Sequence, residues 1–475
     1  MRTSPSYTAS YRLEIDESTL SIAQIVDAVS STGAQIKGLD VADSDRGHIV
    51  IDLTCDMRDS DHRREVRQIL DGLEGVHTSS VADQTFMAHV GGKIEVHPKV
   101  PLRNRDDLSR AYTPGVARVC TAIHDMPEKA HLLTMKANSV AVVSDGTAVL
   151  GLGDIGPEAA LPVMEGKAVL FKQFGDVDAW PVVLDTKDTE EIISIVKAIA
   201  PAYGGINLED ISAPRCFEIE ERLRAELDIP VFHDDQHGTA IVVLAALINA
   251  LKLVNKKIED VRIVVSGVGA AGSAIIKLLL AQGARDIVGY GRTGALAGDD
   301  VEGMHPSRAW LAQNTNPRMV HGSLKEGIAD ADVFIGVSHG NILEPSDIAK
   351  MAPGAIVFAL ANPTPEVDPI AAAEYAAIVA TGRSDYPNQI NNVLAFPGLF
   401  RGLLDAKVKE ITTEVLRVAA VAIASVISED ELSPSYIIPG AFDKRVAPAV
   451  SKAVRRAVRD LPTVDIPVQP DMDVN

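Results

Sequence analysis

The stretch PVFHDDQHGTAIVV, at residues 230–243, sets the organisation of the chain. It joins a short apolar strand to a long run of apolar residues, and Asp234 and Asp235 lie between the two. Adjacent carboxylates repel one another and are costly to desolvate, so a buried pair needs a cation or a proton as its partner. Glu209 and Asp210 form a second pair upstream, in GGINLEDISAP. The two acidic pairs therefore indicate a site of chemistry.

Both acidic pairs follow predicted strands. Strands alternate with helices here, which predicts a parallel sheet whose carboxyl edge carries the four acidic side chains. In open α/β sheets that edge is where ligands bind. Hard carboxylate oxygens without cysteine favour Mg²⁺ or Mn²⁺ over zinc. Either pair alone could consist of helix caps, but two pairs at equivalent positions fit that alternative less well.

A second α/β domain is predicted from residue 261, where VRIVVSGVGAAGSAIIKLLLAQGARDIVGYGR indicates strand, glycine loop, helix and strand. The loop matches the GxGxxG fingerprint, and its position between a strand and a helix gives the motif weight. Such a loop holds a dinucleotide pyrophosphate at the helix N-terminus. Its candidate cofactor-binding residues are Gly267, Gly269, Ala270, Ala271 and Gly272.

The end of the next strand bears on the choice of cofactor. About twenty residues beyond the fingerprint, NAD-binding proteins usually carry an acidic residue for the ribose hydroxyls, whereas this chain has Gly291 and Arg292. The missing carboxylate removes repulsion toward a 2′-phosphate, and Arg292 can pair with it, so the pattern favours NADP, with NAD possible. If Arg292 points to solvent instead, another residue sets the preference.

Later segments add candidate residues on the cofactor side of the sheet. DADVFIGVSHG and GAIVFALANPTPE place Ser338 and Asn362 at the ends of predicted strands. Asn391 and Asn392 lie between short strand-like pieces. Such a pair either marks a turn or is buried and bound to an amide or a carboxylate.

Two side chains are candidates for proton transfer. Lys167 lies in the apolar helix MEGKAVLF, where it either snorkels to solvent or is buried with a lowered pKa. A buried lysine can act as a general base at neutral pH. Tyr112 precedes a predicted helix start, where packing is the commoner role for a tyrosine.

Composition narrows the class of protein. The 475 residues are 46% apolar and 23% charged, which suits a globular chain of two or three domains. A formal net charge of −20 and an aromatic content of 4% disfavour nucleic acid and anionic membranes as partners. Three cysteines without CxxC spacing suggest neither disulfides nor thiolate zinc. With no visible secretory signal, and a longest apolar run too short for a bilayer, we expect a cytoplasmic protein.

The chain is predicted to be an α/β protein of four parts. Residues 1–88 form a ferredoxin-like α+β unit in the order βαββαβ. Residues 89–246 form an α/β catalytic domain, in which SVAVVS, an Asp-Gly turn and a second strand TAVLGL precede the helix with Lys167. Residues 247–400 form a Rossmann-type domain, and residues 401–475 are a helical segment that packs back on the catalytic part.

Several blocks occur together in one order and resemble the malic enzymes of the shorter bacterial type, from about residue 90 onward. They are Tyr112-Thr113-Pro114, SDGTAVLGLGDIGPEAALPVMEGKA, Glu209-Asp210, HDDQHGTA, the glycine fingerprint, ANPTPE and NNVLAFPG. The resemblance implies oxidative decarboxylation of L-malate to pyruvate and CO₂, with NAD(P)⁺ and a divalent metal, through oxaloacetate and enolpyruvate. Residues 1–88 resemble an ACT domain, a module that often binds amino acids or mediates pairing.

The same resemblance implies the metal ligands and the proton-transfer groups. The metal ligands would be Glu209, Asp210 and Asp235. Lys167 would be the general base that takes the malate hydroxyl proton. Tyr112 would be the acid that protonates the enolpyruvate carbon after loss of CO₂.

Further matched residues would support these groups. Asp234 would orient the metal shell or Lys167, and Asn362 and Asn391 would hold the substrate carboxylate and the nicotinamide side. One position departs from the family pattern: Ala148 stands where larger members carry an arginine that clamps the malate carboxylate. Another cation must take that role, either a lysine elsewhere or one from a neighbouring subunit.

Two alternatives remain open from the sequence. An amino-acid dehydrogenase would suit a regulatory unit joined to a nucleotide domain, although such enzymes need no metal and the acidic pairs count against it. A nucleotide-sensing regulatory protein could keep the fold without turnover. We expect a homodimer or higher homo-oligomer, which is the base rate for soluble enzymes, with a possible small-molecule effector at residues 1–88.

Overall fold

The computed structural model describes residues 3–45, 47–149, 151–299 and 301–461. By internal contacts the chain divides into two compact units, Met1–Val96 and His97–Asn475. The division of the second unit into catalytic, nucleotide-binding and C-terminal parts remains a prediction from the sequence.

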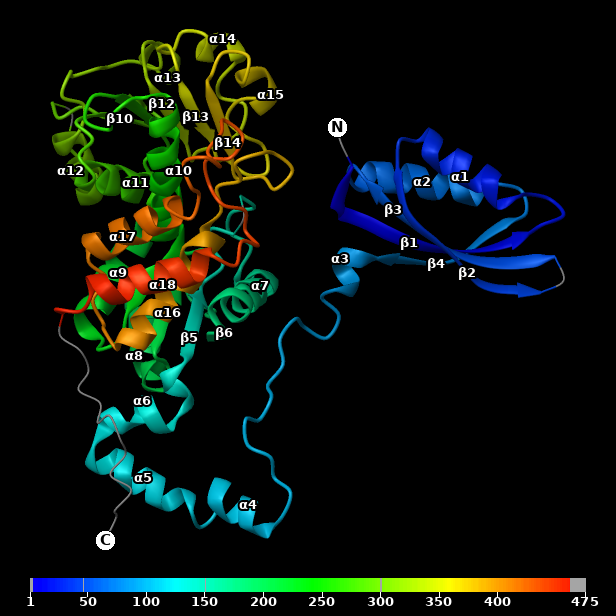
Figure 1. Cartoon of the computed structure of the whole chain (residues 1–475), viewed down its shortest axis with the longest axis horizontal. Coiled ribbons are helices and arrows are strands. Elements are labelled where there is room, and N and C mark those ends of the chain that lie inside the picture. Colours follow the sequence, from blue (N-terminus) through cyan, green and yellow to red (C-terminus); the bar gives the residue numbers. More distant parts are fainter. Residues whose placement is uncertain (1–2, 46, 150, 300, 462–475) are drawn as a thin grey trace. The chain divides into compact units, whose positions relative to one another are not determined.

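The first unit is a four-stranded antiparallel sheet in the order β2-β3-β1-β4 (Figure 1). Alternate residues of β1 point into the core: Ala9, Tyr11, Leu13 and Ile15 are buried, and Arg12 between them pairs with Asp52 on the other face. The order of elements confirms the predicted βαββαβ arrangement. The elements are β1 (Ser4–Asp16), α1 (Ile22–Ser31), β2 (Gln35–Asp45), β3 (His48–Met57), α2 (Ser60–Gly72), β4 (Val76–Asp83) and α3 (Gln84–Met87).

The second unit begins with short helices and continues into a four-stranded parallel sheet, as predicted, in the order β6-β5-β7-β8. The short helices are α4 (Arg105–Ala111), α5 (Val116–Asp125), η1 (Pro127–Lys129), α6 (Ala130–Leu133) and η2 (Met135–Ala137). The sheet and its helices are β5 (Ser139–Ser144), α7 (Pro157–Gly175), β6 (Asp178–Val183), α8 (Thr189–Ile199), η3 (Ala200–Ala202), β7 (Gly205–Leu208), α9 (Arg215–Glu226) and β8 (Val231–His233).

The predicted second strand after the Asp-Gly turn is wrong. Asp145 Oδ1 accepts hydrogen bonds from the Thr147 amide, at 3.1 Å, and the Thr147 hydroxyl, at 2.6 Å, which turns the chain out of the sheet. Beyond this turn only Val149 and Gly153 form a bridge. The glycine-rich segment is therefore a loop at the carboxyl edge of β5.

A six-stranded sheet in the order β11-β10-β9-β12-β13-β14 forms the nucleotide-binding part (Figure 1). All its strand pairs are parallel except that between β10 and β11. Its elements are β9 (Arg262–Ser266), α11 (Ala270–Ala281), β10 (Asp286–Gly291), β11 (Gly294–Ala295), α12 (Pro306–Asn314), α13 (Leu324–Gly327), β12 (Val333–Gly336), α14 (Pro345–Ile348), β13 (Ile356–Ala359), α15 (Pro369–Ala372) and β14 (Ile378–Thr381).

One apolar helix links the two sheets of this unit. The π-helical turn η4 (Asp234–Gly238) continues into α10 (Thr239–Leu253), giving 20 helical residues with a mean hydropathy of 1.4. By length and composition alone this helix could cross a membrane. However, 72% of it is buried inside the protein, where it packs against α11 and α17. Its burial identifies it as a core helix.

The C-terminal segment is helical, as predicted, but its contact with the catalytic part is made by Phe396 and Phe400, which precede residue 401. The helices are η5 (Asn392–Leu394), α16 (Phe396–Ala406), α17 (Thr413–Ala424) and α18 (Val446–Ala457). Two phenylalanines of α16 make this contact. The Phe396 ring lies 4.7 Å from Phe171, and the Phe400 ring lies 5.3 Å from Phe171 and 5.9 Å from Phe232. A cluster of aromatic rings therefore joins α7, β8 and α16.

We expect Phe400→Ala to lower the free energy of unfolding by about 3–5 kcal/mol, because it leaves a cavity among three buried rings. Phe442→Ala is the matched control, since Phe442 is 84% exposed and its loss should cost about 0.5 kcal/mol or less. Urea denaturation measures both. Equal destabilisation by the two substitutions would show that the ring cluster does not hold α16 to the sheet.

Candidate active site

The four carboxylates lie together at the carboxyl edge of the catalytic sheet. Glu209 and Asp210 follow β7, and Asp234 and Asp235 follow β8. The register pairs Leu208 with His233, so the two acidic pairs leave the sheet at the same level. The predicted location of the acidic pairs is thus confirmed.

Three of these carboxylates fit a hard divalent cation. The ligand atoms of Glu209, Asp210 and Asp235 all lie within 4.8 Å of one another. The Asp210 amide donates to Asp235 Oδ2 at 2.9 Å, which orients Asp235 toward the neighbouring strand. Asp210 Oδ2 is buried and has no hydrogen-bond donor within the described part of the chain. Oxygen ligands in this arrangement suit Mg²⁺ or Mn²⁺.

The carboxylates of the cluster are buried and repel one another, and a bound cation would relieve this repulsion. The pKa of Asp210 is raised to about 8, first by burial and then by the charge of the nearby Asp235 carboxylate. Burial also raises the pKa of Glu209 well above its ordinary value; Lys167 opposes this shift, whereas Asp234 and Asp235 add to it. The cluster therefore holds protons at neutral pH that a divalent cation would displace.

Lys167 is buried and bridges the two acidic pairs. Its Nζ lies 2.6 Å from Asp234 Oδ2 and 2.9 Å from Glu209 Oε1, and 4.2 Å from the centre of the Phe396 ring. Burial alone would lower the pKa of Lys167, but the two carboxylates outweigh it, so the pKa is raised above its ordinary value. Of the two predicted alternatives, snorkelling is wrong because Lys167 is buried, and the lowered pKa is also wrong because the two contacting carboxylates stabilise the ammonium.

Asp234 acts on Lys167 and is itself fixed by Asn392. Asn392 Nδ2 donates to Asp234 Oδ2 at 2.9 Å, and the Thr239 hydroxyl donates to Asn392 Oδ1 at 3.2 Å. Asn391 instead caps η5, where its side chain accepts from the Val393 amide at 3.0 Å. The structure therefore brings Asn392, the less certain of the two in the sequence, into the cluster.

A second polar network, which the sequence did not reveal, lies behind the carboxylates. Glu220 on α9 is 5% exposed and accepts from Gln236 Nε2 at 3.0 Å, and His237 Nε2 lies 2.8 Å from its Oε1. Burial would raise the pKa of Glu220, but the charge and hydrogen bond of His237 keep it below its ordinary value. No sequence signal marks Glu220, because it is one of several glutamates on an amphipathic helix. This network ties α9 to the turn that carries Asp234.

Tyr112 is not part of the cluster in one chain. It follows α4 and is 68% exposed. Figure 1 shows α4 and α5 at the amino end of β5, whereas the carboxylates lie at the carboxyl end of the sheet. The expectation that Tyr112 joins Lys167 is therefore not met within a single chain.

The glycine loop has the geometry of a dinucleotide site. Gly267 has a φ of +99°, and a Cβ there would lie 2.7 Å from the Val337 carbonyl oxygen, so only glycine fits this turn. A Cβ at Gly272 would lie 1.7 Å from the Gly267 carbonyl oxygen, which explains the close packing of helix on strand. A Cβ at Gly269 would meet nothing within 4 Å, leaving room at the N-terminus of α11, where Ala270 and Ala271 begin the helix. A pyrophosphate fits that space.

Three other predicted cofactor residues follow strands of the same six-stranded sheet, and Ser338 lies beside the glycine loop. The Ser338 hydroxyl lies 3.1 Å from that of Ser266 at the end of β9. Asn362 follows β13, and its carbonyl oxygen lies 2.8 Å from where a Cβ on Gly151 would be, so the catalytic loop and the nucleotide-binding part meet there. Arg292 follows β10 and is exposed.

Ala148 lies beside the acidic cluster. Its amide donates to the Asp210 carbonyl oxygen at 2.9 Å. A longer cationic side chain at this position would stand next to the carboxylates, so its absence concerns the site itself.

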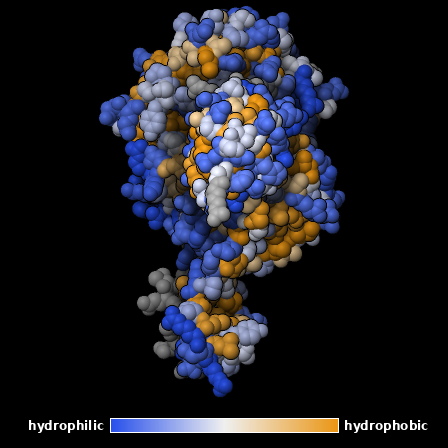
Figure 2. Space-filling model, turned by 90° about the vertical axis from the view of Figure 1, so that its right-hand side faces the viewer, coloured by the Kyte–Doolittle hydropathy of each residue, from blue (hydrophilic) through white to orange (hydrophobic). Residues whose placement is uncertain are grey.

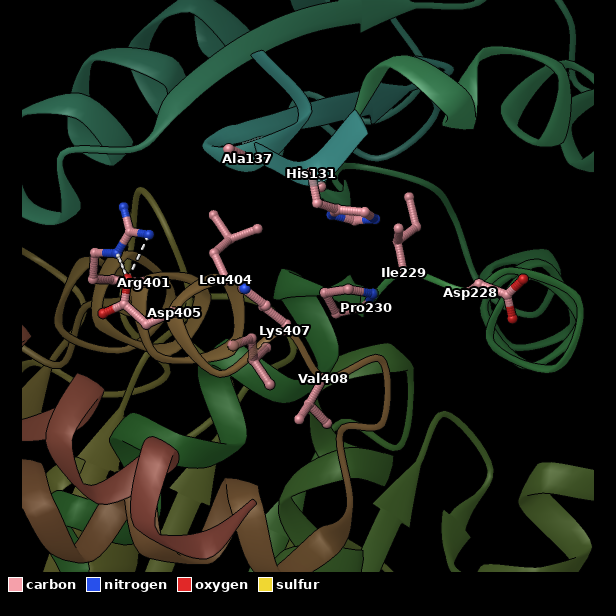
Figure 3. A pocket seen from close by; sticks show the side chains of 12 residues that line it. His131, Ala137, Asp228, Ile229, Pro230, Arg401, Leu404, Asp405, Lys407 and Val408 are labelled. Carbon is pink, nitrogen blue, oxygen red and sulfur yellow. Dashed lines mark hydrogen bonds and ion pairs between the residues drawn. The ribbon is translucent and has the colours of Figure 1, made fainter. Parts of the chain in front are cut away.

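A pocket of about 270 Å³ lies at the opposite edge of the catalytic sheet (Figure 3). It opens between the amino ends of the strands and α16, and its polar lining includes His131, Arg401 and Lys407. The pKa of His131 is lowered to about 4, first by burial and then by the positive charges of Lys136 and Lys407. Asp228 and Asp405 also line this pocket, and Arg401 pairs with Asp405, so the pocket carries charges of both signs and is separate from the acidic cluster.

Because burial and like charge raise the pKa of Asp210 to about 8, the folded protein binds protons at this site that the unfolded chain releases near pH 4. We therefore expect the metal-free protein to lose stability as pH rises toward 8, by up to roughly 1.4 kcal/mol per pH unit for each such group. Mg²⁺ or Mn²⁺ should restore it, and thermal denaturation with and without metal measures the effect.

Asp235→Asn should flatten this pH dependence, because it removes one of the carboxylates that repels Asp210. Asp154→Asn, which removes an exposed acid paired with Lys187, is the matched control and should behave as the unaltered protein. A metal-free protein whose stability rises between pH 5 and pH 8, or one that Mg²⁺ and Mn²⁺ leave unchanged at pH 8, would contradict the assignment.

Comparisons with known proteins identify the family of this chain. Residues 91–224 match the family model described as malic enzyme, N-terminal domain, and residues 236–459 match malic enzyme, NAD binding domain. The chain is 58% identical over 446 residues to the NAD-dependent malic enzyme of Geobacillus stearothermophilus, covering 94% of this chain and 93% of that protein. It is 45% identical over 406 residues to the NADP-dependent malic enzyme of Escherichia coli (strain K12), covering 80% of this chain and 53% of that protein.

A solved structure supports the same assignment. The crystal structure of NAD-dependent malic enzyme from Thermotoga maritima superposes with a TM-score of 0.76 at 51% identity, covering 79% of this chain and 99% of that one. The amino-acid dehydrogenase and nucleotide-sensor alternatives receive no support at this level of similarity. The chain belongs to the malic enzyme family, whose members oxidatively decarboxylate malate with NAD(P)⁺.

Proposed function

We propose that the acidic cluster at the ends of β7 and β8 is the malate site, with Lys167 as the group that exchanges a proton with the C2 hydroxyl. The observation that carries this proposal is the placement of Lys167 Nζ between Asp234 Oδ2 and Glu209 Oε1, at 2.6 and 2.9 Å. A ligand oxygen on a cation held by Glu209 would lie within reach of that ammonium. Glu209, Asp210 and Asp235 would hold the cation.

Each of these residues has its own role in the proposed reaction. A divalent cation held by Glu209, Asp210 and Asp235 would supply Lewis-acid stabilisation of charge on the C2 oxygen, and NAD(P)⁺ at the glycine loop would supply the hydride acceptor. Lys167 accepts the hydroxyl proton as the hydride leaves. Tyr112 donates a proton to C3 after the carboxyl group departs as CO₂, which gives pyruvate. Asp234 and Asn392 orient Lys167 throughout.

The raised pKa of Lys167 is compatible with this role once its surroundings change. As found, the two carboxylates keep the lysine protonated. A cation bound to Glu209 neutralises one of these carboxylates and adds positive charge beside the ammonium, and both effects lower the pKa of Lys167. Metal binding would thereby prepare the base.

A homo-oligomer would complete the site. The helices α4 and α5 contain no buried residue, and their segment exposes apolar side chains such as Leu108 and Tyr112. Figure 2 shows apolar surface on the lower part of the molecule, where these helices lie. A second copy of the chain would cover this surface, and would allow Tyr112 of one chain to reach the cluster of the other.

The named relatives include both NAD-dependent and NADP-dependent enzymes, and the relative at 58% identity is NAD-dependent. Gly291 and Arg292 at the end of β10 favour NADP in this chain, by the argument from the missing carboxylate.

The unit Met1–Val96 would serve as a site for an effector or for subunit pairing, as in ACT domains.

Lys167→Met should lower kcat for malate oxidation by roughly 10²–10⁴-fold, the usual contribution of a general base. The matched control is Lys172→Met on the same helix, because Lys172 is exposed and pairs only with Asp176 and Asp178. NAD(P)H absorbance measures both rates with Mn²⁺ present. A Lys167→Met enzyme with near-normal kcat would remove the lysine from the mechanism.

Mixing two inactive variants tests whether Tyr112 acts across subunits. In a dimer of one Lys167→Met chain and one Tyr112→Phe chain, one of the two sites regains both residues if the tyrosine comes from the partner, so kcat should recover to about half. If both residues come from one chain, neither site is complete and activity stays at the background of the single variants. Differently tagged chains, co-expressed and purified on both tags, provide the mixed dimer.

A further inference from the structure

An arginine that the sequence did not reveal lies where the adenosine ribose of a bound dinucleotide would be. Gly291 is the last residue of β10, the strand that follows the fingerprint helix. A Cβ on Gly291 would lie 2.0 Å from Arg308 Nη2, and 3.5 Å from Cγ2 of Val268 in the fingerprint. The guanidinium of Arg308, which comes from α12, therefore occupies the space that a carboxylate side chain at residue 291 would need.

The guanidinium lacks a counter-charge. Arg308 Nε is buried without a hydrogen-bond acceptor, and no ion pair of Arg308 or Arg292 is found among the described residues. By contrast, Arg318 in the same part of the chain pairs with Asp286 at 2.7 Å. A buried N–H of a cation without an acceptor is costly, which points to an acceptor supplied by a ligand.

We propose that Arg308, with Arg292, forms a subsite for the 2′-phosphate of NADP; this rests on the proposed binding of the dinucleotide at the fingerprint. A phosphate offers several anionic oxygens to the fork of a guanidinium, and Arg292 follows Gly291 directly, so two cations flank the ribose position. The 2′-hydroxyl of NAD carries no charge to balance them. A side chain at residue 291 would require the Arg308 guanidinium to move away from this position.

A fragment that carries the 2′-phosphate tests this subsite without turnover. Adenosine 2′,5′-bisphosphate and adenosine 5′-monophosphate differ only in that group, and isothermal titration calorimetry on the full-length protein gives the dissociation constant of each. We expect the bisphosphate to bind at least about tenfold more tightly, a difference that shrinks at high salt. Equal affinities would overturn the proposal.

Three variants separate the subsite from general effects of charge. Arg308→Met should weaken the bisphosphate about 10- to 100-fold and leave the monophosphate within about threefold. Gly291→Asp should do the same and also shift the preference from NADP⁺ toward NAD⁺, since it displaces the guanidinium and adds a ribose-binding carboxylate. The matched control is Arg318→Met, which removes one positive charge from the start of β10 and should change neither affinity.

The outcomes distinguish this inference from the proposed function. If Arg308→Met weakens the binding of both fragments equally, or of neither, then Arg308 does not bind the 2′-phosphate. This conclusion holds even if the protein oxidises malate normally. If the fragments behave as expected but malate is not oxidised with either cofactor, the subsite stands and the assigned chemistry fails. Circular dichroism of each variant, compared with the Arg318→Met control, shows whether a loss of binding reflects a loss of folding.

Discussion

The catalytic part depends on one buried ammonium balanced against buried carboxylates. Lys167 cannot be desolvated alone, and neither can the acidic residues that follow β7 and β8. Their mutual contact requires α7 to present its lysine to the carboxyl edge of the sheet, and requires β7 and β8 to end at the same level. Phe396 from the C-terminal segment then covers the lysine. Segments separated by more than two hundred residues are thus held together by one charge balance.

This balance is incomplete without a further cation. Four carboxyl groups share the site with one ammonium that contacts two of them, and burial and mutual repulsion raise the pKa of Glu209 and Asp210, which favours their protonated forms. Replacing protons by a divalent cation couples three events: metal binding, release of protons and the loss of the charge that keeps Lys167 protonated. In the proposed function, the same carboxylates that make the metal-free cluster sensitive to pH would also set the charge of Lys167 when a metal is bound.

Local pattern was sufficient for the fold and for the edge that carries the site. Strand ends place side chains in space, so the acidic pairs and the glycine loop could be located from the chain alone. Contacts between segments that are distant in the sequence could not be predicted from the chain alone. The sign of the Lys167 pKa shift depends on Asp234, sixty-seven residues away in sequence. Arg308 enters the ribose position from a helix beyond the next strand. The loop after Asp145 was misread as a strand because its local hydrogen bonds outweigh its apolar residues.

Two separate observations point to an assembly larger than one chain. Tyr112, the proposed proton donor, follows α4 and is exposed, and the helices α4 and α5 bury none of their residues. A lone α4–α5 segment has no core to hold it, so the free energy that fixes its position must come from contact outside the catalytic sheet of its own chain. If a second copy of the chain makes that contact, then its association would both stabilise the α4–α5 segment and complete the site. Subunit dissociation would then remove the proton donor while leaving the lysine–carboxylate cluster intact.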